Sequence, residues 1–354
     1  MKKQAEIKIL RGHWLCTIMA IMLCMPFASF AKWNWFDIDL VGETGYDSNP
    51  ALLTAEEMDQ FEAGSPDFMI IESTDDFFLL AGVDIRNRFS WLGLKLEWSL
   101  LYRYKNYFLN PENSYHLIIP EFAYSGKRIN CAVSYTMIPK YTIRPYSDDE
   151  SQDRASQWCD YNLHRLGVDL RYELRKYSLG FESDLEQDIY NDYFPEYDGT
   201  SFDIGPVIRY SGDIYTKLGY KYKEYHARGY DSEGESKATS DDTDISYVED
   251  RIELYLSARK EILGEKFLLG VSSEFSRRFY TSEKPFEVDY IHVARRDLRA
   301  DIDPFIRWEP NAGLDVNFSF EFTIRDSDSP YYDLDSSKDY IRTGASVQVK
   351  YDIK

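Results

Sequence analysis

Strict two-residue alternation of apolar and polar side chains runs through most of this chain and limits what it can fold into. Between residues 94 and 105 the apolar positions are Leu94, Leu96, Trp98, Leu100, Tyr102 and Tyr104, and most positions between them are charged. Successive side chains of a β-strand point to opposite faces of a sheet, so the pattern predicts a strand with one apolar and one polar face. No comparable stretch shows the 3.6-residue period of an amphipathic helix.

The same alternation recurs about fourteen times along the chain. The predicted strands start near Trp35, Asp75, Leu94, Tyr115, Ile129, Tyr161, Tyr177, Phe202, Ile214, Tyr247, Phe267, Arg295, Leu314 and Tyr340. Short turns are expected at Ser90–Gly93, Ser125–Arg128, Arg175–Lys176, Ser211–Asp213, Lys260–Lys266 and Glu309–Gly313. Longer loops are expected at 47–74, 108–114, 142–160, 191–200, 227–245, 281–294 and 326–339. Alternating short and long connections are typical of outer-membrane barrels.

Long alternating strands favour a membrane barrel over a soluble sandwich, whose apolar faces rarely persist for twelve residues. About 9–11 tilted residues cross a bilayer. Charged residues make up 29% of the chain, which excludes a protein built from apolar spanning helices. The sequence therefore predicts an all-β fold: a closed antiparallel transmembrane β-barrel of about 14 strands, formed by residues 32–354.

Residues 1–31 have the three parts of a cleaved signal peptide. Lys2, Lys3, Lys8 and Arg11 form a basic start, an apolar run extends from Trp14 to Phe27, and Ser29-Phe30-Ala31 offers small residues at the cleavage site. The predicted location is the outer membrane of a Gram-negative cell. The long loops would face the outside and both termini the periplasm.

Two segments resemble known outer-membrane proteins. Residues 345–353 alternate Ala345, Val347, Val349, Tyr351 and Ile353, and this resembles the C-terminal insertion signal of such proteins. Gly45-Tyr46-Asp47-Ser48-Asn49-Pro50 resembles an element after the first strand of several poorly characterised families, among them β-barrel porins and the barrel domain of surface lipoprotein assembly modifiers. The resemblance implies a porin or an assembly barrel. The residue types themselves favour a tight turn, in which Asp and Asn bind the backbone and Pro50 fixes it.

The polar positions of the strands would line the lumen. The predicted pore-lining residues are Arg86, Arg88, Lys95, Arg103, Lys105, Arg171, Asp184, Glu186, Asp188, Lys217, Lys221, Lys223, Glu249, Arg251, Glu253, Arg299, Asp301, Glu321 and Arg325. An acidic strip at residues 182–188 and a basic strip at residues 217–223 lie two strands apart. The strips would either set a transverse field across a selective pore or form ion pairs that stiffen the wall.

The loops hold most of the negative charge. The whole chain carries a formal charge of −20, and residues 47–74 hold seven acids and no Lys or Arg. Oxygen-rich clusters suit Ca²⁺ or Mg²⁺, and the candidate loop sites are Asp241, Asp242, Asp244, Asp326 and Asp328. The alternative is a solvated acidic face. The negative charge also argues against nucleic acid as a partner.

The sequence offers no enzyme motif and no cofactor site. It lacks G-x-S-x-G, H-E-x-x-H and Walker patterns, and Cys131 and Cys159 are expected to be free thiols. The predicted function is a porin-like channel that passes small hydrophilic solutes through a charged lumen. The alternatives are a barrel for export or surface assembly of a polymer or lipoprotein, and a surface interaction protein with acidic, cation-binding loops.

Overall fold

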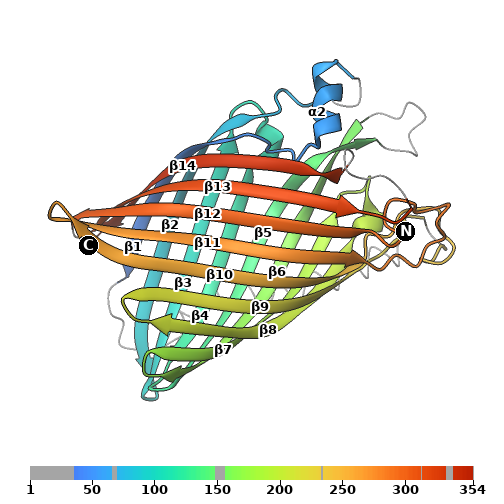
Figure 1. Cartoon of the computed structure of the whole chain (residues 1–354). Coiled ribbons are helices and arrows are strands. Elements are labelled where there is room, and N and C mark those ends of the chain that lie inside the picture. The colour runs from blue at the N-terminus through green and yellow to red at the C-terminus, as the bar shows by residue number, and fades with distance from the viewer. Residues whose placement is uncertain are drawn as a thin grey trace.

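Fourteen antiparallel strands form one sheet that closes on itself in the computed structural model (Figure 1). The structure describes residues 36–65, 70–147, 156–232, 234–311, 313–331 and 338–353. The strands are β1 (Asp37–Asp47), β2 (Asp76–Trp91), β3 (Leu94–Tyr107), β4 (Tyr115–Ser125), β5 (Ile129–Ser147), β6 (Ser156–Leu174), β7 (Tyr177–Tyr190), β8 (Gly199–Ser211), β9 (Ile214–Ala227), β10 (Tyr247–Ile262), β11 (Glu265–Tyr280), β12 (Arg296–Asn311), β13 (Leu314–Asp328) and β14 (Tyr340–Ile353). The short helices of the described part are α2 (Ala55–Glu62), η2 (Pro111–Asn113) and η3 (Pro195–Tyr197).

The barrel closes between its first and last strands. β1 pairs with β14 from Ile38 opposite Ile353 to Asp47 opposite Gly344, and its other edge pairs with β2. Every other strand lies between its two neighbours in sequence. Closure leaves the sheet without an unpaired edge, so the ladder satisfies its backbone groups without water, as a membrane requires. The predicted closed antiparallel barrel of about 14 strands is confirmed.

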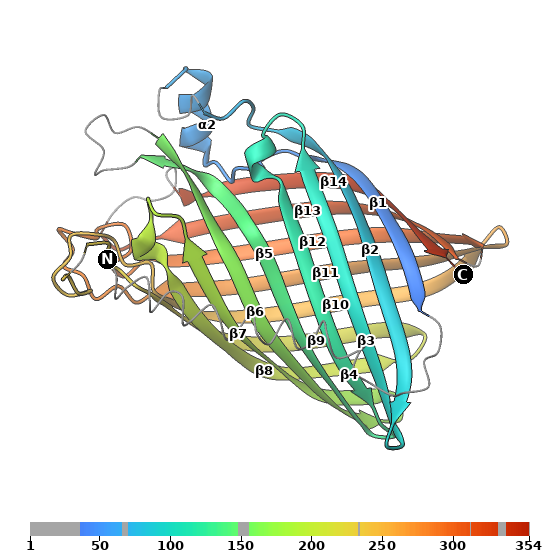
Figure 2. The ribbon, with the colours of Figure 1, turned by 180° about the vertical axis from the view of Figure 1, so that it is seen from behind.

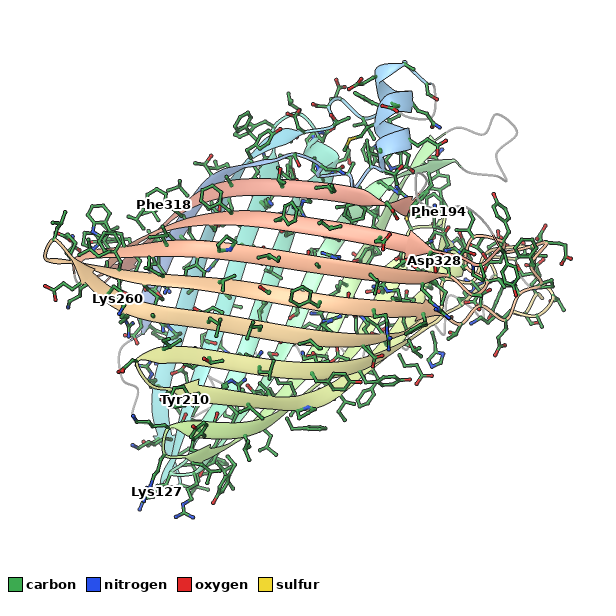
Figure 3. The ribbon with its side chains drawn as sticks, viewed as in Figure 1. Lys127, Phe194, Tyr210, Lys260, Phe318 and Asp328 are labelled. Carbon is green, nitrogen blue, oxygen red and sulfur yellow. The ribbon has the colours of Figure 1, made fainter. Side chains whose placement is uncertain are left out.

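The outer face of the sheet is apolar and exposed. Along β13, Phe320 is 59% exposed, whereas Thr323 on the other face is 6% exposed. Figure 3 labels Phe318, which belongs to the same outer row. Other exposed apolar side chains of this face are Leu40, Leu79, Leu170, Leu185, Leu218, Ile252, Leu298 and Ile306. So large a continuous apolar surface is suited to lipid and not to water.

Placing a charge on this outer face should destabilise the barrel. We expect Phe320→Arg to lower the free energy of unfolding by about 2–4 kcal/mol, because a cation at mid-depth loses its hydration in the hydrocarbon. Phe320→Leu is the matched control and should change it by less than about 1 kcal/mol. Urea titration in lipid vesicles, followed by tryptophan fluorescence, measures both values. Equal stabilities of the two variants would show that this face does not contact lipid.

Short turns occupy one end of the barrel, which we call the turn end, together with the C-terminus (Figure 2). Between β2 and β3, Leu92 and Gly93 both have positive φ, at 49° and 80°. Leu263 and Gly264 repeat this arrangement between β10 and β11, at 55° and 84°. Two successive residues with positive φ form the hairpin turn whose twist matches that of the flanking strands. The Leu-Gly pairs therefore fix the register of two hairpins.

The longer connections lie at the opposite end, which we call the loop end. The strand starts match the predicted positions within a few residues, but two predicted loops were too long. The loop predicted at 142–160 is largely strand, because β5 continues to Ser147 and β6 starts at Ser156. This ribbon is supported by Arg144, which binds Glu57 of α2 at 2.6 Å, and Figure 2 shows both strands reaching toward α2. The loop predicted at 326–339 starts later, since β13 includes Asp326 and Asp328.

Cys131 and Cys159, the cysteines in the described part of the chain, are free, as predicted. Cys131 on β5 lies opposite Leu170, and Cys159 on β6 lies opposite Arg144, so they occupy distant positions of one hairpin. Within the described ranges, no helix is long and apolar enough to cross a membrane. The predicted signal peptide at 1–31 and the expected first-strand start at Trp35 lie outside the described residues.

Candidate functional site: the barrel interior

The charged face of the sheet is the interior face of the barrel, and its charges are paired along the wall. Glu186 on β7 is 5% exposed and accepts hydrogen bonds from Arg165 on β6 at 2.6 Å and from Lys223 on β9 at 2.8 Å. The Lys223 contact passes over β8, which lies between the two strands. Burial makes such charges costly unless they are paired, so these three side chains depend on one another.

The same pattern continues toward the turn end. Lys221 lies 3.2 Å from Asp184, and Lys217 lies 3.1 Å from both Glu182 and Glu253. The acidic strip of β7 and the basic strip of β9 therefore contact each other directly. Of the two interpretations left open by the sequence, the structure shows the ladder of ion pairs, which shortens the reach of any field across the lumen.

A second group of pairs lies on β10 to β13. Glu249 is 2% exposed and binds Arg251 at 2.7 Å and Arg278 at 2.9 Å. Asp297 is bound by Arg295 at 2.8 Å and by Arg325 at 2.6 Å. Further along β12, Arg299 binds Asp301 at 2.8 Å. Each acid of this group is held by arginines from its own strand, from an adjoining strand or from a connecting loop.

The seam of the barrel is held by a third group. Asp39 on β1 lies 2.8 Å from both Arg86 on β2 and Lys350 on β14. Asp84 binds Arg103 at 2.6 Å across the β2–β3 pair. The contact between Asp39 and Lys350 joins the first and last strands of the chain, which meet only through folding.

The hexapeptide at residues 45–50 ends this seam at the loop end. Asp47 is 1% exposed and receives two hydrogen bonds from Arg342 of β14, at 2.8 and 2.6 Å, and one from the hydroxyl of Tyr107 at 2.9 Å. The amide of Asn49 also donates to Asp47, and the Asn49 side chain bonds both backbone groups of Leu53. The predicted turn is present, and Asp47 also ties three strands together.

The remaining predicted interior residues have different surroundings. Arg88 is bound by Glu97 at 2.6 Å near the turn end, and Lys95 is exposed beside the β2–β3 turn. Lys105 is 8% exposed and lies 3.8 Å above the ring of Phe78. Arg171 lies 3.3 Å from Asp169. Glu321 lies 3.8 Å from Arg342. Asp188 is buried beside Glu186.

A layer of tyrosines lines the interior toward the loop end, and the sequence analysis did not anticipate it. One row of rings crosses β4 to β7 and η3, with the centroids of neighbouring rings 4.9–5.6 Å apart. It consists of Tyr115, Tyr141, Tyr161, Tyr190 and Tyr197. A second row, with centroids 5.0–6.0 Å apart, consists of Tyr225, Tyr247, Tyr280 and His292. The two-residue alternation of each strand places these rings on the interior face.

Arginines stack on this layer. Arg278 lies 3.8 Å above the ring of Tyr247, and Arg295 lies 4.7 Å above that of Tyr280. Because the guanidinium groups also bind Glu249 and Asp297, rings and ion pairs form one continuous packing layer. The loop end of the interior is therefore more tightly packed than the turn end.

An open cavity lies on the interior wall between β9 and β11. Its volume is about 590 Å³, and its lining includes Tyr215, Lys217, Glu253, Tyr255 and Ser257, followed by Ser272 and Glu274 on β11. Ligand pockets usually measure about 300–1,000 Å³. This cavity is large enough for a small solute, and its lining combines aromatic rings with hydroxyl and charged groups.

The predicted cation sites in the loops are only partly brought together. Asp242 meets Asp231 and Glu235, with carboxylate oxygens within 4.8 Å of one another, rather than its neighbour Asp241. Asp244 is fully buried and binds Lys237 at 2.8 Å. Asp326 and Asp328 lie on β13. Acidic groups at a surface commonly gather without an ion, so the arrangement alone assigns no metal.

Glu196 on η3 faces the same acidic loop. Burial, together with the negative charges of Asp242, Asp231 and Asp198, raises the pKa of Glu196 to about 8. The folded chain thus holds this proton more tightly than the unfolded chain, in which the pKa is 4.5. The stability that this carboxyl group contributes is complete below the unfolded pKa and is lost as the pH rises through about 8.

This shift predicts a pH-sensitive loop end. Proteolysis of the loops in the reconstituted protein should accelerate as the pH rises from about 5 to about 8 and then level off, as Glu196 loses its proton among the three aspartates. Glu196→Gln keeps the shape and cannot ionise, so the acceleration should be markedly smaller in this variant. Glu112→Gln, at an exposed carboxyl on η2, is the matched control and should retain the full pH dependence. The same acceleration in E196Q would contradict the assignment.

The closed sheet, the apolar outside and the charged inside define the class: this chain is a membrane-spanning β-barrel of the outer-membrane type. No family model matches the chain, and no curated protein matches it. Its fold is similar to several solved outer-membrane proteins. They include a loop L8 deletion mutant of OmpT from Vibrio cholerae (8% identity, TM-score 0.43, covering 90% of this chain and 99% of that one).

Two further similar structures are channels by name. The anion-selective porin from Comamonas acidovorans shows 10% identity and a TM-score of 0.43 over 91% of this chain and 100% of that one. The outer membrane channel DcaP of Acinetobacter baumannii shows 12% identity and a TM-score of 0.41 over 91% of this chain and 97% of that one. These similarities are distant, and the barrel class rests on the geometry of this chain itself.

Proposed function

We propose that this protein is a channel for passive passage of small hydrophilic solutes across the outer membrane. The observation that carries the proposal is which strands the interior ion pairs join. Among the described strand residues, every pair joins positions on one strand, on neighbouring strands or on strands two apart, such as Glu186 with Lys223 and Asp84 with Lys350. The charges thus neutralise each other along the wall and do not bridge the lumen.

A polar wall without cross-lumen bridges supports a water-filled path. The proposed lining consists of the interior charged residues described above, and the cavity between β9 and β11 would be part of the path. The tyrosine layer at the loop end would be its narrowest part. We further propose that residues 1–31 act as a cleaved export signal, which N-terminal sequencing of the protein from outer membranes would check.

Swelling of proteoliposomes tests the proposed channel. Vesicles carrying the folded protein should swell in isotonic solutions of small neutral solutes at rates that fall as solute size increases. Vesicles with the heat-unfolded protein provide the control. Swelling at the rate of the control vesicles would contradict the channel and favour the two alternatives, an assembly barrel or a surface interaction protein.

A further inference from the structure

Three aromatic rings form a platform on the wall beside the interior cavity. Tyr255 of β10 lies at the centre, with the ring of Tyr215 of β9 at 5.7 Å and 71°. The ring of Phe305, from β12, lies 5.8 Å from that of Tyr255 with an interplanar angle of 30°. Tyr215 and Tyr255 both line the cavity of about 590 Å³. The platform therefore spans four strands and presents ring faces in a polar surrounding.

The platform depends on a glycine in the strand between its rings. Phe305 reaches Tyr255 across β11, where Gly270 lies opposite Phe305 in the register. A Cβ atom at position 270 would come within 2.4 Å of Phe305 Cζ and 2.6 Å of Cε1. Only a residue without a side chain leaves room for the ring there. The chain thus provides space for this ring at a position where a strand ordinarily disfavours glycine.

Hydrogen-bonding groups surround the rings. Ser257 and Ser272 offer hydroxyls, and Glu253 and Glu274 offer carboxylate oxygens. The two carboxylates have cationic partners, because Lys217 lies 3.1 Å from Glu253 and Arg251 lies 3.4 Å from Glu274. The cavity therefore presents many acceptors and little net charge.

We infer that this cavity binds a neutral polyhydroxylated solute, a saccharide, with its C–H face on Tyr255 and Tyr215, and with its hydroxyl groups on the serines and glutamates. Phe305 supports the ring of Tyr255 from outside the cavity lining. The inference rests on the proposed channel, for which the saccharide would be the transported solute class. Aromatic faces are electron-rich and attract the polarised C–H groups of a sugar ring. An apolar solute would cover the serine hydroxyls and the carboxylates without offering them hydrogen bonds, and an ionic solute would compete with the existing ion pairs.

Saturation-transfer NMR on the full chain in detergent micelles tests the site, with maltotriose as the probe. We expect saturable transfer from aromatic protons to the sugar. Tyr255→Ala should weaken binding about tenfold, because it removes a stacking face. Phe305→Ala should also weaken binding, because it removes the ring that holds Tyr255 in place. Phe318→Ala, on the outer face, is the matched control and should bind as the wild type does.

Gly270→Ala provides a variant that keeps both rings. Its new methyl group should displace Phe305 and weaken maltotriose binding even if Tyr255→Ala fails to fold; heat-modifiable gel migration shows which variants are folded. No transfer with the wild type, or equal transfer in folded Phe305→Ala and Gly270→Ala, would overturn the inference. Solute flux without saccharide binding would overturn it and leave the channel intact. Saccharide binding without flux would support the site and overturn the proposed channel.

Discussion

Replacing Asp47 by alanine is expected to lower the free energy of unfolding by about 3–5 kcal/mol, because it removes one partner of a buried ion pair. Asp47 accepts two hydrogen bonds from Arg342, one from Tyr107 and one from the amide of Asn49. Its loss would leave the guanidinium, whose side chain is 23% exposed, without its closest acceptor at the seam between β1 and β14. Urea titration in lipid vesicles measures the change.

Two further variants separate the pair from general damage to the seam. Asp37→Ala, at the other end of β1, removes an exposed aspartate and should change stability by less than about 0.5 kcal/mol. The double variant Asp47→Ala/Arg342→Ala should be more stable than Asp47→Ala alone, since no unpaired charge remains. A double variant as unstable as the sum of its single changes would contradict the proposed coupling.

Reversing the charge of Lys223 should have an effect of similar size on the opposite side of the barrel. Lys223→Glu places a carboxylate beside Glu186, at a position where both side chains are less than 10% exposed, and we expect a loss of about 3–5 kcal/mol. Lys223→Met is the matched control. It should cost less than half as much, because Arg165 still neutralises Glu186.

The Lys223 variants also test whether the strips of β7 and β9 act as one unit. If Lys223→Glu and Lys223→Met prove equally stable, Glu186 is not charged in the folded barrel, and the ladder of ion pairs is wrong at this position. Heat-modifiable migration of both variants shows whether the barrel still forms.

Local pattern predicted most of the fold. The alternation from Leu94 to Tyr104 depends only on the two environments of one strand, so it identified β3 without knowledge of its partners. The same argument placed Glu186 and Lys223 on the interior face. It did not show that their side chains meet across β8, because that depends on the register of three strands. The pairing of Asp47 with Arg342 connects residues 295 positions apart, and no local pattern encodes it.

Sequence analysis erred where polar residues continue a strand beyond the membrane. The acids that follow Ser147 favoured a loop, but Arg144 binds α2 and Tyr146 packs on Phe194, so the ribbon of β5 and β6 persists. The sequence analysis also missed the tyrosine layer of the interior. Tyrosine suits both a lipid interface and a packed interior, and only the parity of each residue along its strand distinguishes the two positions.

Planar-bilayer recording with the purified, folded protein tests the central claim, a continuous polar path through the barrel, most directly. The account predicts discrete, reproducible steps of conductance in potassium chloride, because the interior charges pair along the wall and leave the lumen to water and ions. A bilayer that stays at its baseline after insertion of protein shown to be folded by heat-modifiable migration would contradict it.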